Sequence, residues 1–235
     1  MDPDSAPLVE TRKLIKVYLR KSEDQIRAVD GVSLEVHRGE FLAIVGRSGS
    51  GKTTLLNLIG TLDRPTSGSV IFEGENLSDL SNRDLTLLRR HKVGLVFQTF
   101  NLLPTLTALE NLEVALAPTR MSMEKRQEKA KTLLETFELT DRADRLPLEL
   151  SVGQQQKLAI ARALINDPVL ILADEPTGEM DPITGREIVA KLVKLNRNYN
   201  ITLVVTSHGT FPFNQADRIL FLKDGRLVSK EEAGY

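Results

Sequence analysis

The sequence lacks several features that would each point to a particular class of protein. None of its 235 residues is cysteine, which excludes disulfide bridges, thiolate metal sites and cysteine nucleophiles but leaves the redox compartment open. Net charge is also nearly absent, because 31 Lys and Arg oppose 32 Asp and Glu to give a formal charge of −1. We therefore expect no nucleic-acid partner on electrostatic grounds, although local basic patches stay possible.

Long apolar runs are missing as well. No stretch approaches the roughly 20 consecutive apolar residues that a membrane-spanning helix needs. The longest runs, such as Val169 to Ala173, have the length of buried strands. The N-terminal residues MDPDSAPLVE are acidic and lack the basic and apolar segments of a secretory signal. We therefore expect a cytoplasmic chain that reaches the inner face of a membrane only through a partner.

The chain does contain a phosphate loop, which we define as residues 46–53, GRSGSGKT. It fits the pattern Gly-x-x-x-x-Gly-Lys-Thr and follows an apolar run, residues 41–45, that predicts a buried strand. The glycines let backbone N–H groups face inward, and a helix starting near Lys52 points its positive dipole end at the same place. Lys52 would reach the β- and γ-phosphates, and Thr53 would ligate Mg²⁺. The candidate nucleotide-binding residues here are Gly46, Ser48, Gly49, Gly51, Lys52, Thr53 and Thr54.

A second nucleotide motif lies at residues 169–175, VLILADE, where an apolar strand ends in two acids. The strand would place Asp174 beside the phosphate loop, where its carboxylate can hold Mg²⁺ directly or through water. Glu175 would face the γ-phosphate and could orient or deprotonate the attacking water. Each motif alone has an ordinary alternative, a glycine-rich turn with a solvated lysine or two acids exposed at a strand end. Their occurrence in one chain favours nucleotide binding.

The order of predicted elements indicates an α/β fold with a phosphate-loop NTPase core. After a leader expected to be disordered, residues 1–7, the chain opens as antiparallel β, with strands at 8–17 and 32–36 and a hairpin loop at 20–25. A turn cluster is expected at 65–69, and a strand over 93–97 that delivers Gln98 at its end. Helical spacing over 105–116 and 123–137 predicts an inserted α-helical subdomain. After the subdomain, strands and helices alternate again, which predicts a mainly parallel sheet. The strands are expected at 169–174, 201–206, 218–222 and 226–229, and the helix at 182–196.

The signature segment, which we define as residues 150–154, LSVGQ, lies directly before a strongly helical run. Together with the two motifs around it, this segment resembles the signature motif of the ATP-binding cassette family. A physical argument agrees, because Ser151 at a helix N-cap and the N–H of Gly153 would form a second anion site. The resemblance adds Gln154 to the nucleotide-binding residues. Read alone, Ser151 is as readily an ordinary helix cap. Val152 departs from the family's pattern, in which glycine is commonest.

The resemblance implies roles for four further residues. Gln98 would contact Mg²⁺ and water and sense a membrane partner, Asp181 would bind nucleotide from the loop after Glu175, His208 would be a switch histidine, and Tyr18 would stack on adenine. Out of context, His208 is a lone surface histidine and Tyr18 could equally be a core tyrosine at a strand end. Gly209 is a second departure, since aspartate often follows the histidine. The implied catalytic residues are Glu175, His208 and Gln98, and the implied Mg²⁺ contacts are Thr53, Gln98 and Asp174.

The resemblance covers about Leu8 to Ser229, and it implies a single domain over residues 8–230. Its RecA-like core would span residues 8–97 and 167–230, with the helical subdomain at 98–166. The runs GLVFQTFNLLPTLTALENLEVAL and ADEPTGEMD are similar to the lipoprotein-release and macrolide-export (LolD/MacB) type within the family. The cofactors implied are ATP and Mg²⁺.

The implied function is an ATP-hydrolysing subunit that drives separate integral-membrane permease subunits in export, lipid or lipoprotein extraction, or mechanotransmission. Two copies, or a pseudo-symmetric pair, would join head to tail, with Ser151 and Gly153 of one chain closing over the ATP on Lys52 of the other. One alternative is a regulatory module with little turnover, which Val152 and Gly209 slightly favour. Another is a DNA-repair-type ATPase, which would need long coiled coils between Lys52 and Ser151 that the sequence lacks.

Overall fold

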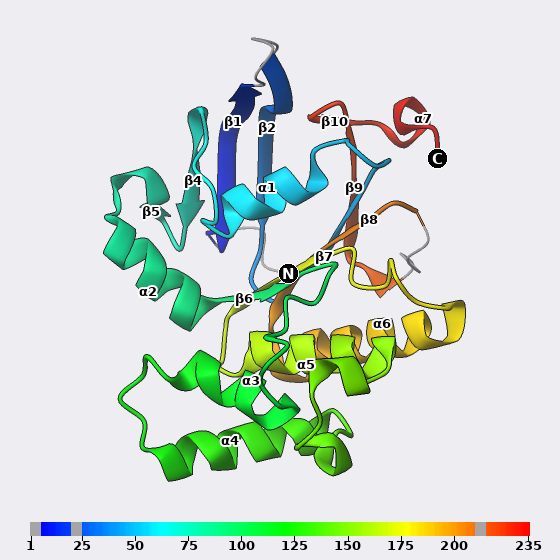
Figure 1. Ribbon diagram of the computed structural model, residues 1–235. Helices are drawn as coiled ribbons and strands as arrows, with labels where there is room; N and C mark the ends of the chain where they lie inside the picture. The colour runs from blue at the N-terminus through cyan, green and yellow to red at the C-terminus, as the bar shows by residue number, and fades with distance from the viewer. Residues whose placement is uncertain (1–5, 20–24, 210–214) are drawn as a thin grey trace.

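The computed structural model describes residues 6–19, 25–209 and 215–235 and contains two β-sheets (Figure 1). The larger sheet has the strand order β10-β9-β3-β8-β7-β6. All of its neighbouring pairs are parallel except the antiparallel pair of β9 and β10. Its strands are β3 (Phe41–Val45), β6 (Val93–Val96), β7 (Leu170–Asp174), β8 (Thr202–Ser207), β9 (Arg218–Lys223) and β10 (Arg226–Val228). The central strands β3 and β8 are buried along their whole length, as expected for parallel strands covered on both faces.

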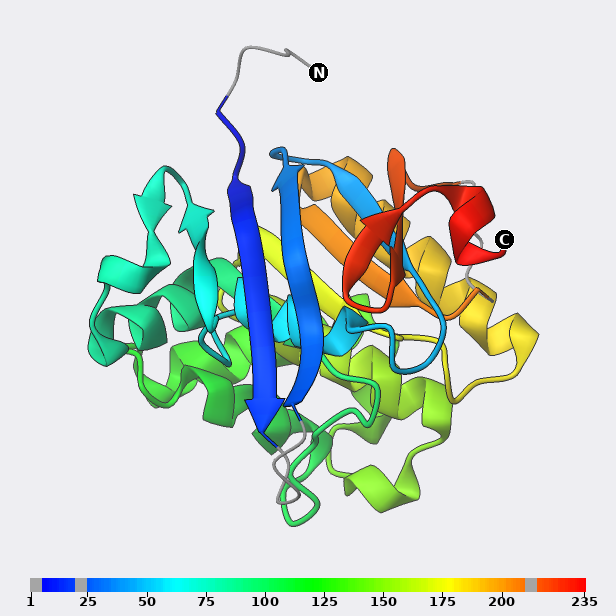
Figure 2. The ribbon, with the colours of Figure 1, turned by 90° about the horizontal axis from the view of Figure 1, so that it is seen from above.

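The smaller sheet is antiparallel and has the order β2-β1-β4-β5. Its strands are β1 (Val9–Leu19), β2 (Gln25–Val36), β4 (Ser67–Phe72) and β5 (Glu75–Asn76). Figure 2 shows β1 and β2 side by side in front of α1 (Lys52–Ile59). One hydrophobic core joins this sheet, α1 and β3, through residues such as Leu14, Leu55 and Ile44. The helix of the phosphate loop is therefore fixed between the two sheets.

A second core lies on the opposite face of the larger sheet. It joins Leu112, Leu134 and Ile160 of the helical insert to Ile171 of β7 and Leu192 of the last long helix. The helices on this side are α3 (Ala108–Leu116), α4 (Met123–Thr136), α5 (Val152–Leu164) and α6 (Pro182–Tyr199). Figure 1 shows α3, α4 and α5 together below the sheet, while α2 (Asn82–Lys92) and α7 (Lys230–Ala233) lie at its two sides.

The fold class agrees with the sequence prediction, but several boundaries were wrong, and α3, for example, begins at Ala108 and not at residue 105. Gln25 was expected in a loop, yet it begins β2 because residues 25–27 pair with residues 17–19 of β1. Ser67 was expected in a turn, yet it begins β4 opposite Ile15. Strand β6 ends at Val96, so Gln98 lies in the turn after it. Residues 25–27 and 67 are exposed, so burial against a core does not make them strands, whereas pairing with β1 does.

Residues 1–5 of the predicted leader and residues 20–24 of the predicted hairpin loop lie outside the described residues. No helix in residues 6–19, 25–209 or 215–235 has the length and apolar character to cross a membrane.

Candidate active site

The phosphate loop connects the carboxyl end of β3 to the first turn of α1. Gly51 has φ 102° and forms the N-cap of α1, and a Cβ there would lie 2.1 Å from the carbonyl oxygen of Ala28. Only glycine meets both conditions. No side chain caps α1, whereas Ser, Thr or Asp side chains cap α2 to α6. The first N–H groups of α1 and the positive end of its dipole are thus left for an anion.

Lys52 points into the loop instead of into solvent. Its side chain is 4 % exposed, and Nζ donates hydrogen bonds to the carbonyl oxygens of Gly46 at 2.7 Å and Arg47 at 3.0 Å. Nζ also lies 3.2 Å from Oε1 of Glu175. The cation is therefore held at the centre of the loop by groups that phosphate oxygens can replace.

Asp174 lies beside the same helix turn. Its Oδ2 accepts a 2.6 Å hydrogen bond from the Thr53 hydroxyl, and its Oδ1 accepts one of 2.5 Å from the Thr206 hydroxyl. Thr206 is fully buried on β8 and also accepts from the backbone N–H of Glu175 at 3.1 Å. No sequence motif indicates this role for Thr206, because it depends on the pairing of Asp174 with Thr206 in the register of β7 and β8.

The Glu175 carboxylate joins Lys52 to His208. One oxygen pairs with Lys52, and the other lies 3.0 Å from Nδ1 of His208, which follows β8. Glu175 has φ 44°, a left-handed backbone conformation that non-glycine residues rarely adopt. Such a strained conformation persists only where surrounding contacts enforce it, and it is frequent at functional sites. The structure thus brings Glu175 and His208 together from segments 33 residues apart in the sequence.

Tyr18 is held in place by two charged neighbours. Its hydroxyl donates to Oδ2 of Asp63 at 2.7 Å, and Nζ of Lys16 lies 4.9 Å from the centre of its ring. Partial burial, followed by the bond to Asp63, raises the pKa of Tyr18. Burial alone would raise the pKa of Asp63, but hydrogen bonds from Lys16 and Tyr18 outweigh it and lower that pKa. The Thr54 side chain also reaches Tyr18, which places the ring beside α1.

The residues around Asp174 fit a Mg²⁺ ion held together with phosphate. Mg²⁺ is usually bound through one or two carboxylates plus substrate phosphates and water. Within the ranges that the structure describes, no group of three or more His, Cys, Asp or Glu could hold a metal ion alone. The adjacent oxygens of Thr53 and Asp174 would supply the protein part of such a phosphate-dependent site.

The signature segment forms the N-terminus of α5. Ser151 is its N-cap and makes a capping box with Gln154, in which each side chain bonds the other residue's backbone N–H, at 3.3 and 3.0 Å. A Cβ on Gly153 would lie 2.6 Å from Cγ2 of Thr184, so glycine lets α5 approach α6. Asp181 caps α6, and hydrogen bonds from the Thr184 hydroxyl and backbone lower its pKa. Together these residues line a cavity of about 350 Å³.

Gln98 lies between these two regions. Its Nε2 donates to Oε1 of Glu179 at 3.3 Å, so the glutamine contacts the loop that follows Glu175. The backbone after it has φ 60° at Phe100 and 50° at Asn101. Both of those carbonyl oxygens accept from the guanidinium of Arg162 on α5.

Asn111 holds the same connection at its other end. It is fully buried, and its Nδ2 donates to the carbonyl oxygens of Leu103, Leu106 and Thr107. Sequence reasoning missed both Arg162 and Asn111. A polar residue at a helix position that would otherwise be apolar was the available signal.

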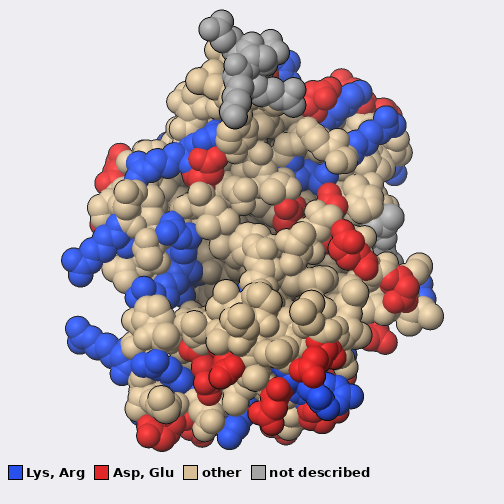
Figure 3. Space-filling view, in the orientation of Figure 1, with Lys and Arg blue, Asp and Glu red and all other residues tan. Residues whose placement is uncertain are grey.

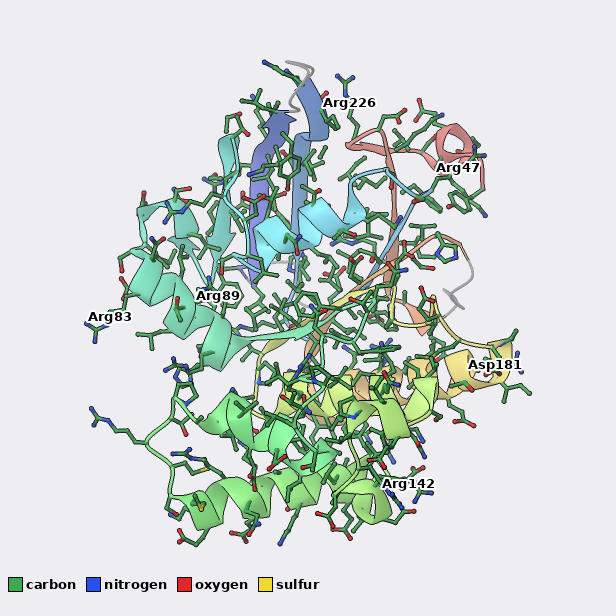
Figure 4. All side chains as sticks on the ribbon, viewed as in Figure 1. Arg47, Arg83, Arg89, Arg142, Asp181 and Arg226 are labelled. Carbon is green, nitrogen blue, oxygen red and sulfur yellow. The ribbon has the colours of Figure 1, made fainter. Side chains whose placement is uncertain are left out.

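The predicted site residues therefore fall into two groups. Lys52, Thr53, Asp174, Glu175 and His208 form one network of contacts. Among the described residues, no hydrogen bond or ion pair joins that network to Ser151, Gly153 or Gln154. Figure 4 shows Arg47 of the phosphate loop beside α7, and Asp181 away from it at the start of α6.

The sequence and structure are similar to those of known proteins. A family model described as ABC transporter matches residues 29–178. An uncharacterized ABC transporter ATP-binding protein of Thermotoga maritima is 48% identical over 212 residues, which cover 90% of each chain. The macrolide export ATP-binding/permease protein MacB of Hyphomonas neptunium is 41% identical over 95% of this chain. The match spans only 34% of MacB itself.

The solved structures of MJ0796, an ABC transporter ATP-binding protein of Methanocaldococcus jannaschii, are also similar. One is a dimeric structure of that cassette, with a TM-score of 0.87, 44% sequence identity, and coverage of 94% of this chain and 97% of the other. Another, with the same values, is a dimeric post-hydrolysis state bound to ADP and phosphate.

Proposed function

Because the chain belongs to the ABC transporter family and is an ATP-binding, ATP-hydrolysing subunit of it, we propose that it works through an ATP-bridged dimer. Hydrolysis in this dimer drives separate permease subunits. The observation that carries the proposal is the contact network of Lys52, Thr53, Asp174, Glu175 and His208. It supports a single site in which Lys52 would bind phosphate, Thr53 and Asp174 would hold a metal ion, and Glu175 would act as a general base.

The chemistry proposed for this site is in-line attack of water on the γ-phosphate. Lys52 would exchange its bonds to Gly46 and Arg47 for phosphate oxygens, as phosphate-loop lysines do. Glu175, freed from Lys52, would accept the proton of the attacking water, while His208 keeps the carboxylate oriented from its other oxygen. Thr53 and Asp174 would hold Mg²⁺, which offsets the negative charge of the phosphates.

The second half of the site would come from another copy of the chain. Ser151, Gly153 and Gln154 start α5, whose dipole favours an anion. They are not bonded to the Lys52 network of their own chain in the described residues. A head-to-tail pair would bring each such segment to the other chain's ATP, with Asp181 and Gln98 beside it. The dimeric MJ0796 structures, one bound to ADP and phosphate, support this arrangement.

The partner that receives the motion would be an integral-membrane permease, with the chain peripheral to it on the cytoplasmic side of the membrane. The ATP-binding/permease relative MacB supports such a pairing. Uncharged surface runs across the middle of the face in Figure 3, with Lys and Arg gathered along the edge where α2 lies. Leu103, in the connection from β6 to α3, is 44% exposed. ATP hydrolysis would drive the permease in export, in extraction of a lipid-anchored molecule, or in mechanical signalling.

Steady-state ATP hydrolysis by the Glu175→Gln variant tests this mechanism. Glutamine keeps the size and hydrogen-bonding capacity of the side chain but cannot accept a proton, so turnover should fall about 10²- to 10⁴-fold while ATP still binds. Glu128→Gln, an exposed change on α4, is the matched control and should keep wild-type turnover. Near-wild-type turnover in Glu175→Gln would remove the glutamate from its proposed role.

A further inference from the structure

Tyr235 contacts the backbone of the switch histidine from the end of α7. Its hydroxyl donates a 3.2 Å hydrogen bond to the carbonyl oxygen of His208. The ring of the same histidine faces Glu175, with Nδ1 3.0 Å from the carboxylate. Tyr235 thus bonds the peptide that carries the histidine, and within the described residues no hydrogen bond joins it to Glu175.

Gly209 makes room for the tyrosine ring. A Cβ at residue 209 would lie 2.9 Å from Cε1 of Tyr235, and the backbone there has φ +115°, which side chains rarely tolerate. The glycine in place of the family's frequent aspartate is therefore matched to the ring that packs over it. The departure from the family pattern at Gly209 therefore provides the space in which the Tyr235 ring packs.

Several contacts fix Tyr235 relative to the phosphate loop. Its ring centre lies 5.7 Å from that of Phe221 on β9, and Phe221 pairs in register with Val45, the last residue before the loop. Helix α7 is capped by Ser229, and Lys223 of β9 donates to its Glu232 carbonyl at 2.8 Å. Gly234 also packs near Arg47, since a Cβ on the glycine would lie 3.4 Å from a guanidinium nitrogen. In Figure 4, Arg47 lies beside α7.

We propose that Tyr235 is a positioning residue for ATP hydrolysis, which holds the His208 backbone so that the imidazole meets Glu175. Tyr235 is 40% exposed, so the contact can open and close without unfolding a core. The hydroxyl acts through the histidine and not on substrate. This inference rests on the proposed role of His208, and it assigns Tyr235 the task of positioning that histidine.

The test compares turnover in Tyr235→Phe, which removes only the hydroxyl, with turnover in Tyr235→Ala, which also removes the ring. Loss of one neutral hydrogen bond corresponds to about a two- to tenfold fall in kcat for the phenylalanine variant. Alanine should reduce kcat further. KM for ATP should stay unchanged, because the phosphate loop keeps its contacts. The equivalent substitutions at Tyr199, an exposed tyrosine at the end of α6, should leave both constants unchanged.

A double-mutant cycle with His208→Ala separates positioning from a general structural effect. If Tyr235 acts through the histidine, Tyr235→Phe should cause no further loss of single-turnover rate once His208 is alanine. An equal fold-loss in both backgrounds would overturn the inference, as would an unchanged kcat in Tyr235→Phe while His208→Ala is impaired. Wild-type turnover in His208→Ala would instead reject the proposed role of the histidine itself, and the inference with it.

Discussion

The phosphate-loop side and the signature side of the molecule are built differently. On the first, Lys52 pairs with Glu175, Thr53 bonds Asp174, and the two acids contact Thr206 and His208, so residues from distant segments already hold each other. On the second, the side chains of Ser151 and Gln154 bond only each other's backbone among the described residues, and Ser151 is exposed. The first region holds its polar side chains in a network, whereas the second is a helix start for which, among the described residues, no hydrogen bond or ion pair reaches that network.

The difference in contacts between the two sides determines what each side can gain when nucleotide binds. Binding of phosphate to the first side exchanges internal contacts for new ones, so it changes the network without ordering a new segment. Closure of a second chain over the signature side would add contacts that the described residues of one chain do not make. Nucleotide binding and chain association would then be coupled.

The largest effect is expected from Ser151→Arg in the Glu175→Gln background. Glu175→Gln should retain ATP and accumulate as a dimer at concentrations where the wild type is monomeric. Arginine in place of exposed Ser151 would block the second phosphate site across the interface, so the dimer should be lost. Gel filtration with light scattering in the presence of ATP measures both states.

The matched control is Ser122→Arg, at the exposed N-cap of α4 in the helical insert. It should leave the ATP-dependent dimer intact, because α4 supplies none of the residues proposed to close over ATP. A Ser151→Arg double mutant that still dimerises with ATP would show that the signature segment does not contact the nucleotide of the other chain.

A smaller effect, within one chain, is expected from Thr206→Val. Valine keeps the shape but leaves the Glu175 N–H unpaired and removes a donor to Asp174. The free energy of unfolding should fall by about 1–3 kcal/mol, measured by urea denaturation. Thr132→Val is the control, since that exposed hydroxyl bonds a carbonyl within its own helix. Equal losses in both variants would mean that the buried hydroxyl contributes nothing special to the site.

The contrast between Thr206 and Lys52 shows what the sequence could predict. Lys52, Asp174 and Ser151 belong to contiguous motifs whose spacing sets their chemistry, so their placement on a loop, a strand end and a helix start followed from the sequence. Thr206, Arg162 and Asn111 act through partners 31, 61 and 8 residues away in the sequence. Such partners are chosen by sheet register and by the packing of α5 and α3, which local patterns do not specify.

The same limit applies to Tyr18 and to the strand boundaries. A strand-end tyrosine was expected there, but its bond to Asp63 depends on the packing of β1 against α1, which the residues before Asp63 form. Likewise, the exposed start of β2 is a strand only because β1 lies next to it. Contacts between elements, and not local propensity, decide these cases.

Loss of the Tyr18 ring should weaken ATP binding on the phosphate-loop side without affecting the signature side. Base–aromatic stacking contributes about 1–3 kcal/mol in nucleic-acid binders, so Tyr18→Ala should reduce affinity roughly tenfold or more. Tyr18→Phe keeps the ring and should change affinity much less, although it removes the bond to Asp63. Equilibrium binding of ATP measures both, with Tyr199→Ala as the control, and unchanged affinity in Tyr18→Ala would take the ring out of the adenine site.

The smallest effect on the isolated chain is expected from Leu103→Asp. This substitution lies outside both halves of the ATP site and tests the surface proposed to contact the permease. Leu102 packs against the helical core, whereas Leu103 is 44% exposed and its backbone is held by Asn111. The free energy of unfolding should therefore change by no more than about 0.5 kcal/mol. Capture of the membrane subunit from detergent should be lost, while Leu62→Asp, at 45% exposure elsewhere, should retain it. Continued capture by Leu103→Asp would place the coupling contact on other residues.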